Sequence, residues 1–513
     1  MQPSLFRRLS DALLAAVALV AIGASVWNLR AATADLAIER VTVGEIPATV
    51  FRPAAGPPGP AVVIAHGFAG SQQLMQSFAI TLARNGYVAV TFDLAGHGRN
   101  PEPLTGSVTD TSGATRKLVD ETAEVAGFAR RLGDGRLAVL GHSMASDVVV
   151  RFAEATPDVA ATVAVSMFSP AVTAHAPRNL LVIVGGWEGM LKREALRVVG
   201  LSVAPAPAAP SVTYGTPADG SARRIAFSPH VEHVGVLFSR ASMQEAVGWF
   251  DAAFGIERAE APILEPRGLW ILLLFAGVVA LARPLSRLLP TVAAPPIGAS
   301  LRWSRLWPTL FVPMFAAPLL LRFLPTHFLP VLVGDYLAAH FALYGALTAL
   351  CLLLARRPVR ERLPARRARA ALAVATAAVI SYGFVGLVWP IDTFVTSFVP
   401  GRERLFLVLA MLAGTLPYFL ADEWATRAPG AGRLAYPASK LAFLVSLAIA
   451  VALDFRRLFF LVIIVPVIML FFVVYGLISR WSYARTGDPA VAATASALAF
   501  AWAIGVTFPL VAG

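Results

Sequence analysis

The pattern of hydrophobic and polar positions divides the chain into two parts. Residues 36–260 alternate short apolar runs with amphipathic segments, as a soluble domain does, whereas residues 268–511 consist of long apolar runs separated by short loops. A helix needs about 20 apolar residues to cross the hydrocarbon core of a membrane. Segments near that length run approximately over 268–288, 305–324, 335–355, 371–391, 404–421, 438–454, 458–478 and 490–511. Residues 261–513 are therefore predicted to form an all-α polytopic transmembrane domain of about eight helices.

A further apolar stretch, residues 12–27, follows two arginines near the N-terminus. Basic residues before an apolar stretch keep the N-terminus inside and direct the following chain outside. A cleavable signal peptide is the alternative, because residues 32–34 resemble a small-residue cleavage site. The stretch is longer than the apolar region of a usual signal peptide, so we interpret residues 1–35 as a transmembrane anchor. Both interpretations export residues 36–260.

Arginine is distributed unevenly among the loops of the apolar part. If residues 36–260 lie outside, the inside loops are about 289–304, 356–370, 422–437 and 479–489. Arginine concentrates in them, above all at positions 356, 357, 360, 362, 366, 367 and 369. The pairs Arg402/Arg404 and Arg456/Arg457 fall on the outer side and are minor exceptions. By the positive-inside rule, the pattern predicts a multi-pass protein of the bacterial plasma (inner) membrane with its soluble domain on the extracytoplasmic side.

Strand and helix patterns alternate in the soluble part. Continuous apolar runs of strand length lie at 61–65, 87–92, 137–140, 161–165 and 180–184. Segments with a helical spacing of apolar positions lie at 72–84, 115–132, 144–155 and 241–254. Such alternation is typical of a mostly parallel sheet with helices on both faces. The predicted fold class is therefore α/β for residues 36–260.

A serine stands at the junction of one predicted strand with the next helix. The sequence there is Gly141-His142-Ser143-Met144-Ala145. A sharp strand-to-helix turn with small residues two positions on either side of a serine is a nucleophile elbow, which exposes the hydroxyl above the sheet. The last position is usually glycine, but Ala145 is small enough for the turn to close. Ser143 is the candidate nucleophile.

The loop after the first buried strand, His66-Gly67-Phe68, is a candidate for half of an oxyanion hole. The backbone N–H of Phe68 would be one donor and that of Met144, directly after the nucleophile, the other. The His66 side chain is interpreted as a turn residue. The segment 93–99, which follows the next strand, is interpreted as a structural loop in which Asp93 and His97 take part.

A candidate acid and base follow the serine in chain order. Glu188 lies just beyond the strand at 180–184, with Asp219 as the substitute. His233 is preferred to His230 as the base, because it lies next to a glycine and closer to the last helix.

On these motifs, residues 61–254 resemble the α/β-hydrolase superfamily, nearest to bacterial esterases, lipases and dienelactone-hydrolase-type enzymes. The resemblance implies a Ser143–Glu188–His233 triad, an acyl-enzyme and hydrolysis of a carboxylic ester, such as that of a lipid. An acyltransferase with the same triad is the first alternative, and a transporter or scaffold carrying a hydrolase-fold binding module is the second. Ala145 in place of glycine and Glu188 in place of the commoner aspartate depart from the usual pattern. The resemblance does not cover residues 268–513.

The amino-acid composition indicates which kinds of partner the protein is expected to bind. Hydrophobic residues make up 57% of the chain and charged residues 14%, well below the quarter usual in soluble proteins. The net charge of +12 sits largely in loops beside apolar runs, so we expect contact with the lipid bilayer and no nucleic acid. The single cysteine, Cys351, lies in an apolar run and leaves no disulfide within the chain. No metal or organic cofactor is expected, and the oligomeric state stays open.

Ionisable residues in the membrane part are candidates for function because burying a charge in lipid is expensive. Most of them, including Asp422 and Glu423, fall at predicted span ends and are expected to be solvated at the interface. Asp335 and His340 share one predicted span and are kept as a candidate substrate portal or second site.

Overall fold

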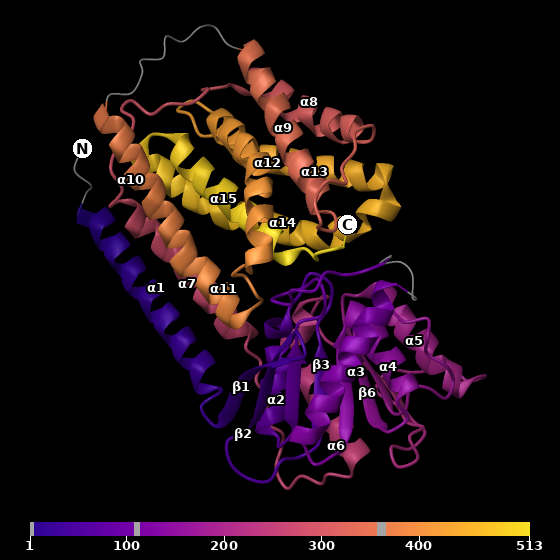
Figure 1. Ribbon diagram of the computed structural model, residues 1–513. Coiled ribbons are helices and arrows are strands. Elements are labelled where there is room, and N and C mark those ends of the chain that lie inside the picture. Colours follow the sequence, from indigo (N-terminus) through magenta and orange to yellow (C-terminus); the bar gives the residue numbers. More distant parts are fainter. Residues whose placement is uncertain (1–4, 107–112, 356–365, 513) are drawn as a thin grey trace.

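The protein is described by a computed structural model over residues 5–106, 113–355 and 366–512, in which a sheet-bearing part adjoins a bundle of helices (Figure 1). The predicted inside arginines at 356, 357, 360 and 362 lie outside the described residues.

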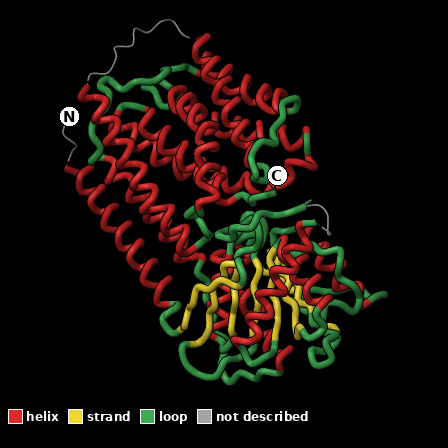
Figure 2. Tube along the Cα trace, viewed as in Figure 1, coloured by secondary structure: helices red, strands yellow, loops and turns green. Residues whose placement is uncertain are grey.

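A nine-stranded sheet forms the centre of the first part, in the order β1-β2-β4-β3-β5-β6-β7-β9-β8 (Figure 2). The strands are β1 (Leu36–Val43), β2 (Ile46–Pro53), β3 (Ala61–Ala65), β4 (Val88–Phe92), β5 (Leu137–His142), β6 (Val159–Val165), β7 (Leu180–Gly185), β8 (Thr213–Tyr214) and β9 (Arg223–Ser228). The six strands from β4 to β9 in the sheet order pair in parallel. The apolar runs did not predict the parallel strand β9, nor the antiparallel edges formed by the hairpin β1–β2 and the short β8.

Helices cover both faces of this sheet. Alternate strand residues point to opposite faces, so Val62 and Ile64 pack toward α2 (Gln76–Arg84) and α6 (Arg240–Phe254). Val63 packs with α3 (Ala114–Leu132) and α4 (Met144–Ala155), and α5 (Gly189–Val203) covers β7 on that same side. The predicted α/β architecture is confirmed.

The second part is all-helical. Among the described residues, nine helices are long and apolar enough to cross a membrane, and they coincide with the nine predicted spans. They are α1 (Leu5–Ala31), α7 (Gly268–Ser286), α8 (Trp303–Leu321), α9 (Gly334–Ala355), α10 (Arg366–Gly383) continued by a π-turn and α11 (Trp389–Phe394), α12 (Arg402–Thr426), α13 (Ala435–Leu453), α14 (Phe455–Thr486) and α15 (Pro489–Thr507).

Several predicted boundaries were wrong. Residues 422–426 and 479–486, assigned to inside loops, continue α12 and α14. Residues 508–511, assigned to the last span, are extended instead, because they leave the bundle and bond to the neighbouring loops: Leu332 N donates to Pro509 O at 2.9 Å, and Leu104 N donates to Leu510 O at 2.9 Å.

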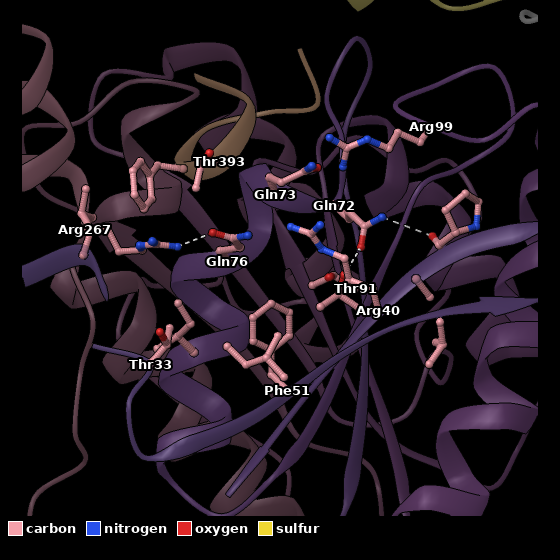
Figure 3. A pocket seen from close by; sticks show the side chains of 18 of the residues that line it. Thr33, Arg40, Phe51, Gln72, Gln73, Gln76, Thr91, Arg99, Arg267 and Thr393 are labelled. Atoms are coloured by element: carbon pink, nitrogen blue, oxygen red, sulfur yellow. Dashed lines mark hydrogen bonds between the residues drawn. The ribbon is translucent and has the colours of Figure 1, made fainter. Parts of the chain in front are cut away.

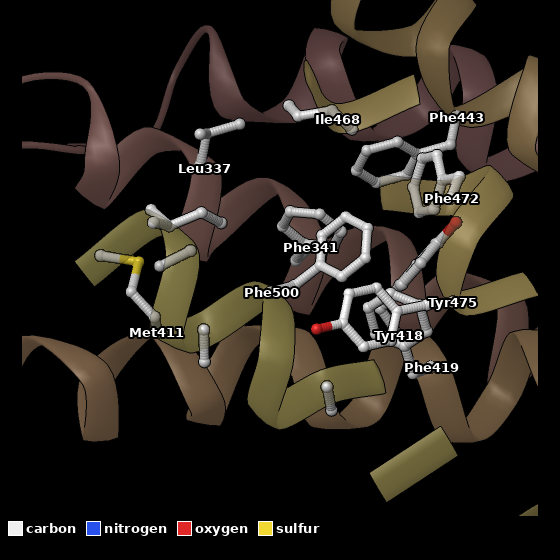
Figure 4. Close-up of a cluster of buried hydrophobic side chains, with 14 of the residues drawn as sticks. Leu337, Phe341, Met411, Tyr418, Phe419, Phe443, Ile468, Phe472, Tyr475 and Phe500 are labelled. Carbon is white, nitrogen blue, oxygen red and sulfur yellow. The ribbon is translucent and has the colours of Figure 1, made fainter. Parts of the chain in front are cut away.

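Aromatic rings fill the centre of the bundle (Figure 4). Phe341 of α9 stacks on Phe443 of α13 with centroids 4.6 Å apart, and Phe472 of α14 stacks on Phe500 of α15 at 5.0 Å. Glycine lets the backbones approach closely: a Cβ on Gly345 would lie 2.6 Å from the Cα of Tyr418 in α12. Small residues at helix contacts are the usual basis of packing in membranes, where no hydrophobic force drives helices together.

Two acidic residues in α12 depart from the expectation of interfacial solvation. Asp422 and Glu423 are buried among the helices. Asp422 is paired with Lys440 of α13, and Glu423 accepts from Arg427 Nε at 3.0 Å and from Ser479 Oγ at 2.6 Å. The solvation prediction was wrong for this pair because helix α12 extends one turn further than the hydropathy suggested and carries both carboxylates inside.

The candidate residues Asp335 and His340 are both buried in α9, but they lie in different surroundings. Asp335 accepts the N–H of Phe328 at 3.2 Å and lines a cavity of about 560 Å³ at the end of the bundle next to the sheet. His340 lies deeper, with Nε2 3.1 Å from Ser446 Oγ. The structure does not bring the two into one site.

The carboxyl edge of the parallel strands faces the helical bundle (Figure 1). Arg404 of α12 is fully buried there and donates to Gly96 O at 2.7 Å and to Phe508 O at 2.8 Å. Arg404 was an exception to the predicted concentration of arginine in inside loops. The structure explains it, because the side chain bonds to carbonyl groups at the junction of the two parts and does not lie in a loop. Leu510 N also donates to Gly96 O, at 2.9 Å, so the loop after β4 is held by the helical part.

Candidate active site

The three predicted residues Ser143, Glu188 and His233 meet at the carboxyl edge of the sheet. Ser143 follows β5, Glu188 follows β7, and His233 lies in the loop after β9. His233 Nε2 is 2.9 Å from Ser143 Oγ, and His233 Nδ1 is 2.6 Å from Glu188 Oε1. Since a carboxylate only accepts, Nδ1 carries the imidazole proton and Nε2 is free to accept the serine hydroxyl. This geometry can take a proton from Ser143 and stabilise the resulting imidazolium.

The backbone at Ser143 is strained. Its φ is +54° and its ψ is −119°, a conformation that costs a non-glycine residue about 1–3 kcal/mol. A Cβ on Gly141 would lie 2.7 Å from Cγ2 of Val149, so that position requires glycine. Ala145 is fully buried in the first turn of α4, and its methyl group is accommodated in the packed core. The turn therefore tolerates alanine at position 145, where the usual motif has glycine.

Glu188 is held by hydrogen bonds beyond the one to His233. Its Oε2 accepts from Ser166 Oγ at 2.6 Å and from the Gly185 N–H at 2.6 Å. Burial on its own raises the pKa of this carboxyl, but the bonds from His233, Ser166 and Gly185 outweigh burial and leave the pKa of Glu188 below its ordinary value. Glu188 is thus an anion at neutral pH.

Ser166 was not singled out from the sequence. It follows β6 directly in a left-handed conformation, with φ +51°, between the elements that carry the serine and the acid. Its position directly after a buried parallel strand, at the edge where the other candidates lie, was the available signal.

Replacing Ser166 by alanine should lower kcat by roughly tenfold with little change in KM, because one of the bonds that orient and ionise Glu188 is lost. The pKa of Glu188 should rise, so activity should be lost at a higher pH on the acidic side than in the parent protein. A pH profile of kcat measures both effects. Ser169→Ala, which removes a buried serine bonded to Asp147, is the matched control; equal profiles for the two variants would exclude a role for Ser166.

A second histidine supports the loop of His233. His142 Nε2 donates to the His233 carbonyl at 3.0 Å. Burial, together with the nearby His233, lowers the pKa of His142 to about 3, so the ring stays neutral and keeps its proton for this bond. The alternative candidates lie elsewhere: His230 occupies an exposed turn with φ +59°, and Asp219 accepts from Ser221 N–H at 2.8 Å in a surface loop.

The loop after β3 lies against the serine, as an oxyanion hole requires. A Cβ on Gly67 would be 2.9 Å from Ser143 Cβ, so only glycine permits this approach. His66 Nδ1 donates to Gly67 O at 2.8 Å, while its Nε2 accepts the Leu94 N–H at 3.1 Å. Because the peptide is planar and trans, holding the Gly67 carbonyl directs the Phe68 N–H to the opposite side. The His66 side chain, interpreted as a turn residue, therefore orients this peptide.

Asp93 organises the neighbouring loop. Its carboxylate accepts from the backbone N–H of Gln72 at 2.8 Å and of Arg99 at 3.0 Å. His97 is buried, with Nδ1 2.9 Å from Ala95 O. Neither residue contacts the triad, in agreement with the structural role expected for segment 93–99.

Exposed apolar side chains lie close in sequence to the candidate residues. Phe168 and Trp187, on the loops after β6 and β7, are 65% and 69% exposed, and Met190, in the first turn of α5, is 67% exposed. Phe68 stacks on Phe460 of the apolar helix α14, with centroids 4.1 Å apart. The side chain of a candidate oxyanion-hole residue therefore rests directly on the helical bundle. Within the described ranges, no group of three His, Cys, Asp or Glu side chains could hold a metal ion.

Residues 56–206 match the family of serine aminopeptidases designated S33. Solved structures similar to this chain include a putative dienelactone hydrolase from Klebsiella pneumoniae, with 17% identity, 43% of this chain and 99% of that chain covered, and a TM-score of 0.32. A dienelactone hydrolase from Anabaena variabilis has 20% identity, coverage of 42% and 97%, and a TM-score of 0.30. A predicted CIB-like hydrolase from Thermoplasma acidophilum has 13% identity, coverage of 43% and 98%, and a TM-score of 0.32. No curated protein matches the chain.

Proposed function

We propose that this α/β hydrolase is a membrane-anchored serine hydrolase that cleaves a carboxylic ester of a hydrophobic or lipid substrate. The observation that carries the proposal is the continuous hydrogen-bonded chain from Ser143 through His233 to Glu188. The strained turn at Ser143 supports it further, since strain of this kind persists where the surrounding structure maintains it and clusters at functional sites.

The proposed reaction proceeds through an acyl-enzyme. His233 takes the proton of Ser143 as Oγ attacks the ester carbonyl, and Glu188 stabilises the imidazolium. The N–H groups of Phe68 and Met144 donate to the developing oxyanion, each contributing about 3–4 kcal/mol. His233 then protonates the departing alcohol, and water, activated by the same imidazole, releases the acid and restores Ser143.

The apolar surroundings of the site support a hydrophobic substrate. Exposed aromatic side chains are costly in water and mark surfaces that bind apolar partners. Phe168 and Trp187 are such side chains, and Phe68 bridges the site to α14 through Phe460. The substrate is proposed to reach Ser143 along the junction with the membrane part. The bilayer is thus both the anchor and the source of the substrate.

We propose that α1 is retained as an anchor and that the soluble domain, residues 36–260, lies on the extracytoplasmic side. Asp11 of α1 is buried and lies 3.5 Å from Arg283 Nε of α7, and a Cβ on Gly277 of α7 would be 3.0 Å from Ala18 O. A cleaved signal peptide would leave both contacts without a partner. The proposed side follows from the arginine distribution.

Product analysis tests the reaction class. The full-length protein in vesicles is supplied with a long-chain ester, with and without a second alcohol. Free acid as the main product under both conditions supports hydrolysis. Transfer of the acyl group to the added alcohol would replace hydrolysis by acyl transfer on the same Ser143. The absence of both the free acid and the transfer product would contradict the proposal.

Replacing Trp187 by alanine should lower kcat/KM on vesicle-embedded long-chain esters by roughly tenfold, because burial of one large apolar side chain against the substrate is worth about 1.5–3 kcal/mol. Activity on a short soluble ester should change much less. Leu201→Ala is the control, since Leu201 is also exposed, at 39%, but lies about 18 Å from the start of α5, the helix that follows Trp187. Equal losses on both substrates would count against an apolar approach path.

A further inference from the structure

A cavity of about 460 Å³ lies between the antiparallel edge of the sheet and the ends of three membrane helices (Figure 3). Its walls come from α1, β1, β2, β4, the start of α2 and α11. The triad is not part of it. The cavity reaches Thr91 of β4, and only β3 separates β4 from β5, so the wall nearest to the serine-bearing strand lies about 10 Å from it at the usual strand spacing.

Four arginines, and no aspartate or glutamate, line this cavity. They are Arg30, Arg40, Arg99 and Arg267. Arg99 is neutralised by Asp392, with Nη2 2.7 Å from a carboxylate oxygen. Within the part of the chain that the structure describes, the other three have no carboxylate within 4.0 Å. The cavity therefore carries an excess of positive charge.

Nearby arginines outside the cavity are paired, in contrast to Arg30, Arg40 and Arg267. Arg52 on β2 donates to Glu39 Oε1 at 2.6 Å, and Arg84 at the end of α2 lies 3.1 Å from Asp35 and 3.7 Å from Glu265. The carboxylates of Glu39, Asp35 and Glu265 thus pair with arginines that do not line the cavity.

Arg267 is the buried member of the set, 3% exposed. One guanidinium nitrogen donates to Gln76 Oε1, and the ring face of Phe394 lies 5.8 Å from the guanidinium carbon. Its Nε has no hydrogen-bond partner among the described residues. Burial lowers the pKa of Arg267 to about 10, an effect that Glu265 partly offsets. A buried cation with a free donor is expensive unless an anion joins it.

The cavity lies at the level where lipid headgroups are found. Arg30 stands in the last turn of the span that ends at Ala31, Arg267 immediately precedes the span that begins at Gly268, and Phe394 ends the span that begins at Ala368. Span ends mark the boundary between hydrocarbon and water, where phosphate groups are the most abundant anions.

We propose that this cavity binds a phosphate group, presented by the headgroup of an anionic phospholipid or by a free phosphate compound. Guanidinium groups bind phosphate through paired, charge-assisted hydrogen bonds, and here Arg40 and Arg267 converge from different elements on one space (Figure 3). Arg30 adds a third charge from the membrane side. The site is independent of the ester hydrolase proposal, because none of its residues contacts Ser143, Glu188 or His233.

The test measures ligand binding to the full-length protein in detergent by native mass spectrometry and thermal shift. The probes are phosphatidylglycerol, diacylglycerol with the same acyl chains, and inorganic phosphate. Arg40→Ala and Arg267→Gln remove one charge each, and Arg52→Ala removes an arginine of the neighbouring strand that pairs with Glu39 outside the cavity. Arg40 is exposed, and its side chain makes no hydrogen bond among the described residues. Arg40→Ala should therefore fold and test the binding site even if Arg267→Gln fails to fold.

Phosphatidylglycerol should bind, diacylglycerol should not, and both cavity variants should weaken binding about tenfold while Arg52→Ala leaves it unchanged. Binding of inorganic phosphate with the same dependence on Arg40 assigns the site to a free phosphate compound. Equal binding of diacylglycerol and phosphatidylglycerol, equal binding by Arg40→Ala and the parent protein, or binding of neither phosphate probe would overturn the proposal. Cleavage of a short soluble ester should be the same in Arg40→Ala as in the parent protein.

Discussion

Ser143→Ala is expected to abolish labelling by a fluorophosphonate probe and to lower ester cleavage by about 10⁴–10⁶-fold. The reason is that Ser143 Oγ, which lies 2.9 Å from His233 Nε2, is the atom that bonds to the acyl group in the proposed mechanism. The residual rate would come from the backbone N–H donors and from substrate binding alone. Gel fluorescence after labelling, together with initial rates on a short soluble ester, measures both effects.

A matched control is available in the same region. Ser169 is buried and donates to Asp147 at 2.6 Å, but it does not contact His233. Ser169→Ala should keep both labelling and activity, so a loss in Ser143→Ala cannot be attributed to a missing buried serine in general. Full labelling of Ser143→Ala would refute Ser143 as the nucleophile.

His233→Ala and Glu188→Gln are expected to produce the second large loss, about 10⁴-fold in kcat for each. Without the imidazole, Ser143 loses the acceptor that lies 2.9 Å from its hydroxyl oxygen. In Glu188→Gln, the new side-chain amide would present an N–H to Nδ1 of His233 and favour the wrong tautomer, with the proton on Nε2, where it blocks acceptance from the serine. The two losses should not add in the double variant, since the three side chains act as a unit. Initial rates on a short soluble ester, measured at saturating substrate, give kcat for each variant.

Two further variants test the alternative base, His230, and the alternative acid, Asp219. His230→Ala alters an exposed turn residue, and Asp219→Asn alters a surface carboxylate bonded to Ser221. Both should retain most of the parental kcat. If Asp219→Asn were more damaging than Glu188→Gln, the assignment of the acid would have to be exchanged.

Much of the architecture is determined by local pattern. Each span is recognisable because about 20 apolar residues suffice to cross the hydrocarbon. The parallel sheet is recognisable because buried strands are continuous apolar runs set between amphipathic helices. Ser143 is recognisable for the same reason: a strand, a serine between small residues and a helix follow one another directly in the chain. Glu188 could be placed by its position after the strand at 180–184, and His233 by its order after the acid and before the last helix.

What the sequence could not provide is contact between distant segments. The edge strand β1 is largely exposed, and β2 mixes apolar with polar positions, so neither shows a continuous apolar run and hydropathy missed them. Ser166 contacts Glu188 only because β6 and β7 are neighbours in the sheet. Arg404 looks like a loop charge in the sequence, yet it is buried on Gly96 and Phe508 at the junction of the two parts.

The same limit applies to buried charge. Asp422 and Glu423 read as interfacial residues because their partners, Lys440 and Ser479, lie on other helices. Arg40 and Arg267, far apart in the chain, line one cavity only after the sheet edge meets the ends of three spans. Hydropathy and turn chemistry act over a few residues and are therefore written locally, whereas the electrostatic environment of a side chain is set by whichever segments pack around it, and that is decided by the tertiary structure alone.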